Sequence, residues 1–228
     1  MSYDHPSSRT LSMGDVTTVM PASAQRVLRN TYALLGLTLA FSAATAGAAM
    51  AFNWPAPGLI LTLVGFYGLF FLVNKFANSG KGVLAVFALT GFMGYTLGPT
   101  LNAVMAIPGG ASAITNALAA TAAAFLGLSA VALVTKRDFS FMGKFLFVGS
   151  LVGVVLGLGA IFFEVPALSL AVSGLFVLIA SGMILFETSR IVNGGETNYV
   201  MATVSLFVSI YNLFTSLLML FGLGGRDE

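Results

Sequence analysis

The sequence contains no cysteine and a single histidine, and both scarcities exclude classes of function. Without cysteine there can be no disulfide, no zinc–thiolate site and no cysteine nucleophile. The histidine, His5, lies near the N-terminus and outside every long apolar run. No Ser–His pair or histidine-based zinc site can therefore form inside those runs.

Charged residues are also scarce, at 8% of the chain, and few of them lie where intramembrane chemistry would need them. All four aspartates lie outside the apolar runs, which excludes a paired-aspartate membrane protease. The lysines lie at run ends or between runs, whereas a retinal Schiff base needs a lysine within a helix. A Walker loop and a dinucleotide fingerprint are absent as well. We therefore predict that the protein is not an enzyme, with no catalytic residue, no cofactor and no firm metal site.

Apolar residues dominate what is present, at 57% of the chain, which is typical of an integral membrane protein. About 20 uncharged residues in a helix cross the hydrocarbon core of a bilayer. Seven runs meet this criterion, and they cover residues 30–52, 57–74, 82–106, 112–134, 145–163, 166–186 and 199–221. The sequence therefore predicts an all-α protein with seven transmembrane helices. A net charge of +2 is too small to indicate nucleic-acid binding.

The positive charges predict how the chain is oriented. With a cytoplasmic N-terminus, every Lys and Arg except Arg226 falls on the inner side, as the positive-inside rule requires. The C-terminus is then outside. We predict a flexible cytoplasmic tail over residues 1–28, a transmembrane domain over 29–222 and a short C-terminal tail over 223–228.

Small residues in the fifth run indicate close helix packing. Gly149, Gly153 and Gly157 recur every four residues, so on a helix they form one ridge. Such ridges let transmembrane helices approach closely. We interpret the ridge as a packing face and not as a ligand site.

The last run carries a polar stripe, formed by Ser205, Ser209, Asn212 and Ser216 at helical spacing. A buried packing face is favoured for it over a conduction path, because hydroxyls in spanning helices commonly bond their own backbone. Either way, unsatisfied polar groups are costly among lipid tails. We therefore predict that the other helices cover this stripe and that the seventh helix is central.

Glu187 is the one acidic residue that follows an apolar run without a turn signal. One interpretation is an interfacial ion pair with Arg190, three residues later, worth about 0.3–0.5 kcal/mol. The other is a functional carboxylate, since ionisable groups at the membrane boundary often have functional roles. The pattern alone leaves both interpretations open.

Three stretches around this carboxylate resemble one known family. They are Leu185–Ile191 (LFETSRI), Ala202–Phe214 (ATVSLFVSIYNLF) followed by Leu217 and Leu218, and Glu196–Tyr199 (ETNY). They resemble the Bax inhibitor-1 family, also called the transmembrane BAX inhibitor motif proteins, and ETNY is similar to its bacterial YccA branch. The resemblance implies a seven-helix fold in which six helices wrap the last one, and a location in the bacterial inner membrane.

The resemblance also implies two functions. The YccA branch implies an inner-membrane modulator that binds and inhibits the ATP-dependent protease FtsH. We expect the N-terminal tail to make the first contact with the protease, and the lipid bilayer to surround the helices. Calcium-leak members imply the alternative, a pH-linked calcium or cation leak channel that uses two carboxylates. Glu187 matches the first carboxylate, but the second position falls on Ser209. The candidate ion or proton site therefore consists of Glu187, Ser209 and Asn212, with calcium as its ligand.

Overall fold

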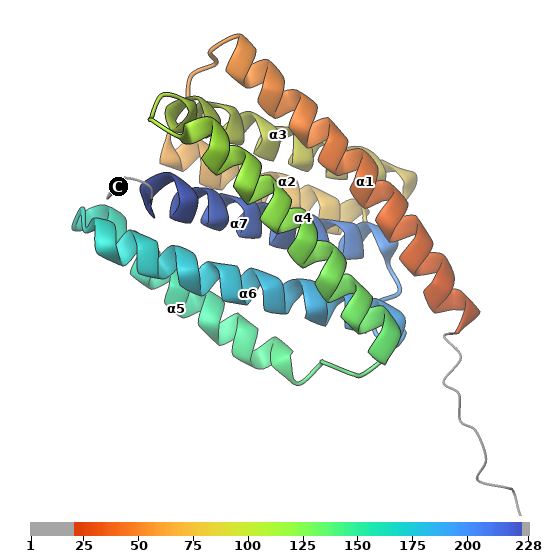
Figure 1. The fold of residues 1–228 in the computed structure, drawn as a ribbon. Coiled ribbons are helices and arrows are strands. Elements are labelled where there is room, and N and C mark those ends of the chain that lie inside the picture. The colour runs from red at the N-terminus through yellow and green to blue at the C-terminus, as the bar shows by residue number, and fades with distance from the viewer. Residues whose placement is uncertain (1–20, 225–228) are drawn as a thin grey trace, which may run out of the picture.

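The computed structural model describes residues 21–224, and within this range all regular secondary structure is helical (Figure 1). The seven helices are α1 (Ala22–Ala51), α2 (Leu59–Phe76), α3 (Gly80–Met105), α4 (Gly110–Thr135), α5 (Met142–Phe162), α6 (Pro166–Val192) and α7 (Tyr199–Gly224). All seven are long and apolar enough to cross a membrane. The predicted all-α fold with seven spanning helices is confirmed.

The helix boundaries differ from the predicted runs mainly at two ends. Helix α1 begins at Ala22, so residues 22–28 are helical and do not belong to a flexible tail. The predicted apolar run begins only at residue 30, because the arginines before it are charged. Arginine is nevertheless a good helix former, so the helix itself can begin earlier. Helix α6 similarly continues past residue 186 to Val192. Residues 1–20 and 225–228, which include most of the predicted tails, lie outside the described residues.

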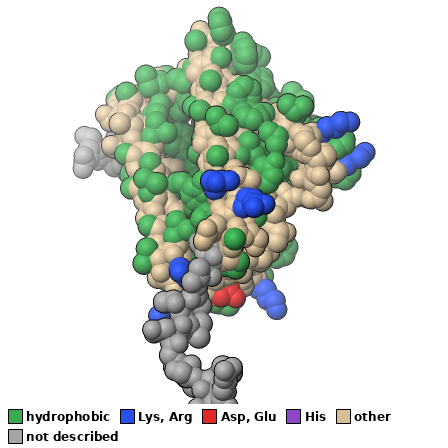
Figure 2. All heavy atoms as spheres, turned by 90° about the vertical axis from the view of Figure 1, so that its right-hand side faces the viewer, with side chains coloured by type: hydrophobic (Ala, Val, Ile, Leu, Met, Phe, Trp, Pro, Cys, Tyr) green, Lys and Arg blue, Asp and Glu red, His purple; other side chains and the backbone are tan. Residues whose placement is uncertain are grey.

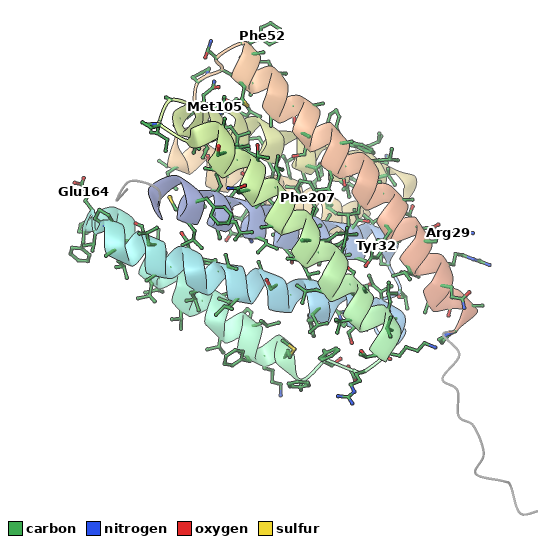
Figure 3. The ribbon with its side chains drawn as sticks, in the orientation of Figure 1. Arg29, Tyr32, Phe52, Met105, Glu164 and Phe207 are labelled. Carbon is green, nitrogen blue, oxygen red and sulfur yellow. The ribbon has the colours of Figure 1, made fainter. Side chains whose placement is uncertain are left out.

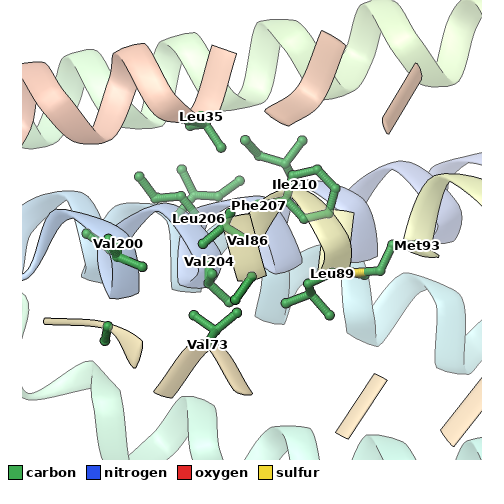
Figure 4. Packing of buried hydrophobic residues seen from close by; sticks show 14 of the residues in the cluster. Leu35, Val73, Val86, Leu89, Met93, Val200, Val204, Leu206, Phe207 and Ile210 are labelled. Carbon is green, nitrogen blue, oxygen red and sulfur yellow. The ribbon is translucent and has the colours of Figure 1, made fainter. Parts of the chain in front are cut away.

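Helix α7 is the central element, as predicted. It packs against α1, α2, α3, α4 and α6, whereas α5 contacts α6 alone among the described helices. The main core cluster combines α7 residues such as Phe207, which is 1% exposed, with Leu35 of α1 and Leu89 of α3 (Figure 4). The burial of apolar side chains therefore centres on the last helix of the chain.

Glycines allow the closest helix contacts. An added Cβ at Gly153 of α5 would lie 2.9 Å from the ring of Phe176 in α6. At Gly149 and Gly157 it would lie 3.4 and 3.6 Å from other α6 side chains. The ridge of glycines on α5 thus lies against α6, the one helix that α5 contacts.

Helices α1 and α3 approach each other even more closely. An added Cβ at Gly98 of α3 would collide with the Cβ of Ala49 in α1 and lie 3.0 Å from the carbonyl oxygen of Ala46. Gly94, one turn earlier, faces the backbone of Ser42 in the same way. The small residues of α3 therefore set the distance between these two helices.

The described basic residues gather at one end of the bundle. This end carries the start of α1 and the turns between α2 and α3, α4 and α5, and α6 and α7 (Figure 2). Its basic residues are Arg26, Arg29, Lys75, Lys81, Lys136, Arg137, Lys144 and Arg190. We call it the basic end. Glu164, labelled in Figure 3, lies in the turn between α5 and α6 at the opposite end.

Candidate functional site

Glu187 lies in the last two turns of α6, near the basic end, and is 4% exposed. Arg190, one helical turn later, donates from Nη1 to Oε2 of Glu187 over 3.4 Å. The guanidinium also lies over the ring of Phe186, with 5.5 Å between its Cζ and the ring centroid. A buried carboxylate needs such a partner, because an isolated charge is costly away from water.

Arg190 connects this carboxylate to the turn between α6 and α7. Its Nη2 donates to Oε2 of Glu196 over 3.3 Å, so one guanidinium lies between two carboxylates. The other oxygen of Glu196 accepts the backbone N–H of Asn198 at 2.8 Å. The charges of Glu187 and Arg190 are therefore part of a network that shapes the entrance to α7.

Asn198 begins α7 and fixes it to another turn. Its Oδ1 accepts the backbone N–H groups of Val200 at 2.9 Å and Met201 at 3.2 Å, as an N-cap residue does. Its Nδ2 donates to the carbonyl oxygen of Ala77 and to Oδ1 of Asn78, in the turn between α2 and α3. A hollow of about 390 Å³ lies between these two turns. The ETNY tract therefore has a structural role, since it caps the central helix.

The end of α6 also holds the loop between α4 and α5. Ser189 donates to the carbonyl oxygen of Arg137 over 2.9 Å and accepts the N–H of Phe139 over 3.0 Å. In the same loop, hydrogen bonds from the hydroxyl and backbone N–H of Ser140 lower the pKa of Asp138. The residues around Glu187 thus connect three turns of the basic end.

Four buried hydroxyl groups near this end have no hydrogen-bond partner among the described residues. They belong to Thr31 and Tyr32 of α1, Ser129 of α4 and Thr188 of α6, the residue after Glu187. A buried hydroxyl without a partner costs about 1–3 kcal/mol.

The polar stripe of α7 is only partly covered. Ser209 is 4% exposed and donates to the carbonyl oxygen of Ser205 over 2.8 Å, and Ser216 is 9% exposed. Ser205 is partly buried, whereas Asn212 is exposed. The prediction that the other helices cover the whole stripe is therefore wrong at Asn212. The described helices thus leave one side of α7 open at Asn212, and α5 makes no contact with α7.

A second polar contact joins α7 to α3. The hydroxyls of Tyr211 and Thr96 lie 3.1 Å apart, and Thr96 also donates to the carbonyl oxygen of Met93 over 2.8 Å. This pair satisfies the Tyr211 hydroxyl within the bundle. The sequence analysis did not identify it, because the two residues are 115 positions apart.

The sequence analysis also missed the structural roles of Ser189, Asn193 and Asn198. Asn193 donates to the carbonyl oxygens of Ser189 and Arg137, so it helps to hold the loop before α5. Only Asn198 had a local signal, as an asparagine directly before an apolar helical run. Arg137, the partner that Ser189 and Asn193 share, lies 52 positions from Ser189 and 56 from Asn193, so these contacts leave no local pattern.

Comparison with known proteins supports one family. The family model described as inhibitor of apoptosis-promoting Bax1 matches residues 24–226. The chain is 54% identical over 205 residues to the Modulator of FtsH protease YccA of Escherichia coli K12, with 90% of this chain and 93% of that protein covered. The same identity and coverage hold for the Inner membrane protein YccA of E. coli O6:H1. An uncharacterized Pseudomonas aeruginosa protein is 54% identical over 202 residues, which cover 89% of this chain and 91% of that protein.

Proposed function

Because this chain belongs to the Bax inhibitor-1 family, we propose that it binds and inhibits a membrane protease of the FtsH type in the bacterial inner membrane. The similarity to the E. coli modulator over nearly the whole of both chains carries the proposal. A regulator of this kind acts by occupying the protease, without chemistry of its own. We place the basic end of the bundle in the cytoplasm, following the positive-inside rule.

A contact surface for the protease is the open side of α7. The exposed amide of Asn212 lies midway along this helix, and its side chain makes no hydrogen bond to the described residues. Side chains such as Asn hydrogen-bond across helices in membranes, with about 1–2 kcal/mol in model peptides. We assign this amide to contact with a transmembrane helix of the protease.

The test measures degradation of a membrane-protein substrate by the purified protease in lipid vesicles, with and without this chain. The chain should slow degradation and co-purify with the protease. Asn212→Leu should weaken both effects. Asn116→Leu is the matched control, because Asn116 is also an exposed amide in a spanning helix, on α4. Unchanged degradation rates with the wild-type chain would refute the proposed function.

A deletion of residues 2–20 tests the separate prediction that the N-terminal tail makes the first contact. Weaker co-purification would support that role, and unchanged co-purification would contradict it. A reporter fused to the C-terminus tests the orientation. If a reporter that works only outside the cytoplasm is active, and one that works only inside is not, the result agrees with an outer C-terminus.

The alternative function is a pH-linked cation leak through a site at Glu187. The buried hydroxyl of Thr188, the residue after Glu187, has no hydrogen-bond partner among the described residues and favours this alternative. Against it, α7 carries no acidic residue, so the two-carboxylate switch of calcium-leak members lacks its second group. Calcium-dye flux in vesicles at acidic and alkaline pH tests the alternative, and flux equal to that of empty vesicles would exclude it.

A further inference from the structure

A groove of about 490 Å³ runs between α1 and α4, with α7 as its floor. No Cα atom of α1 lies within 8 Å of a Cα atom of α4 along the described parts of these helices. The walls carry small side chains, such as Ala43 and Gly47 on α1 and Ala122 on α4, and the floor carries Phe214. In Figure 1, α1 and α4 run in nearly the same oblique direction, and α4 crosses α7. The groove is therefore a gap between helices that larger side chains would have closed.

The groove extends over only half of the bundle. Its lining on α1 runs from Leu39 to Met50, and on α4 from Ile114 to Phe125. Each stretch is about 16 Å long at 1.5 Å per residue. One leaflet of the hydrocarbon core is about 15 Å thick, half of the full core. The groove thus matches the depth of the leaflet opposite the basic end.

Two features define the ends and the opening of the groove. Toward the basic end, the rings of Tyr32 and Phe125 close it, with 5.8 Å between their centroids (Tyr32 is labelled in Figure 3). Sideways it opens to the surroundings of the bundle, because Gly47 and Ala122 are exposed. A molecule in that leaflet can therefore enter the groove laterally.

Three polar side chains line the groove, and one of them, Ser42, makes no side-chain hydrogen bond to the described residues. The Thr121 hydroxyl donates to the carbonyl oxygen of Ala117 over 2.6 Å, and the Tyr211 hydroxyl is paired with Thr96. The lining therefore offers mainly apolar contacts to an occupant.

We propose that the groove is a binding site for one phospholipid acyl chain from the leaflet opposite the basic end. Its length, its closed inner end and its apolar lining fit a single extended hydrocarbon chain. A chain in this site would supply the dispersion contacts that α1 and α4 do not make with each other. The site is separate from Glu187 and does not depend on the proposed protease.

A tryptophan reporter tests this site, because the chain contains a single tryptophan, Trp54. The variant Trp54→Phe with Phe214→Trp places the only indole on the groove floor, where Phe214 is 7% exposed. The full-length protein is placed in vesicles of phosphatidylcholine with or without bromine atoms midway along the acyl chains. Bromine quenches fluorescence on contact, so a bound chain should remove most of the indole signal.

Two glycine substitutions make the test specific. An added Cβ at Gly47 or Gly36 of α1 meets no atom within 4 Å, but only Gly47 lines the groove. Gly47→Leu should fill the groove and restore most of the fluorescence, and Ala43→Leu should do the same. Gly36→Leu should leave the quenching unchanged. Gel filtration of each variant confirms that it is folded. Absent quenching, or equal quenching with Gly47→Leu and Gly36→Leu, would overturn the proposal.

Discussion

Replacing Arg190 by methionine should destabilise the protein more than neutralising Glu187 itself. Methionine keeps an unbranched apolar side chain over Phe186, so the change mainly removes the charge. It leaves Glu187 buried without its cation. Breaking a fully buried ion pair from one side costs about 3–5 kcal/mol. Because the Arg190 side chain is 32% exposed, water shares its role, and we expect a loss of about 2 kcal/mol.

Glu187→Gln should cost less, about 0.5–1 kcal/mol, for two reasons. The amide oxygen can still accept a hydrogen bond from Arg190, and Arg190 retains Glu196 at 3.3 Å. The double variant Glu187→Gln with Arg190→Met removes the uncompensated charge. It should therefore be more stable than Arg190→Met alone.

Equilibrium unfolding of the purified protein in mixed detergent micelles measures these differences. Unfolding is followed by far-ultraviolet circular dichroism as the fraction of denaturing detergent rises. A double-mutant cycle then gives the coupling between the two side chains. If Arg190→Met costs no more than Glu187→Gln, or if the two losses simply add, the ion pair does not stabilise the end of α6 and our reasoning is refuted.

Three further predictions concern other parts of the bundle. Gly98→Ala should destabilise the protein by about 1–3 kcal/mol, because the new methyl group meets the backbone of α1. Gly36→Ala should be neutral or stabilising, because the added Cβ meets no atom within 4 Å. Equal melting temperatures of the two variants would contradict this prediction. Asn198→Ala should cost about 1–2 kcal/mol in the same melting experiment through the loss of the α7 N-cap, and Asn198→Ser should recover part of it. Since hydrogen bonds from Ser140 lower the pKa of Asp138 below 3.8, its contribution to loop stability is present above pH 3.8 and lost as the pH falls through the folded value. A carboxyl NMR titration with a midpoint at or above 3.8 would disprove that.

The spans and the central helix could be predicted because they depend on local composition and periodicity. Long uncharged runs can cross a bilayer only as helices, and the polar stripe identified α7 as the covered one. The exposure of Asn212 could not be predicted, because it depends on how the other helices pack around α7, which no local pattern specifies. The start of α1 at Ala22 was missed for another reason, since hydropathy measures where a helix enters the membrane and not where it begins.

The site was predictable only in part. Glu187 and Arg190 were identified by their spacing of three residues on one helix, which is a local relation. The connections from Asn198 to Asn78 and from Ser189 to Arg137 join residues that are 120 and 52 positions apart. Without aligned relatives, a single sequence contains no signal for such pairs.

The central position of α7 has a consequence for biosynthesis, because it is synthesised after the other six described helices. Leu35 of α1 and Leu89 of α3 enter the membrane well before Phe207, their partner in the core, has been made. Until α7 is inserted, the core side chains of the six earlier helices lack their partners on α7. The turn between α6 and α7, which follows Glu187, is also incomplete. The nascent chain therefore passes through a stage at which its inner faces are accessible to lipids, insertion factors and proteases. The core is completed only after the other six described helices have been synthesised.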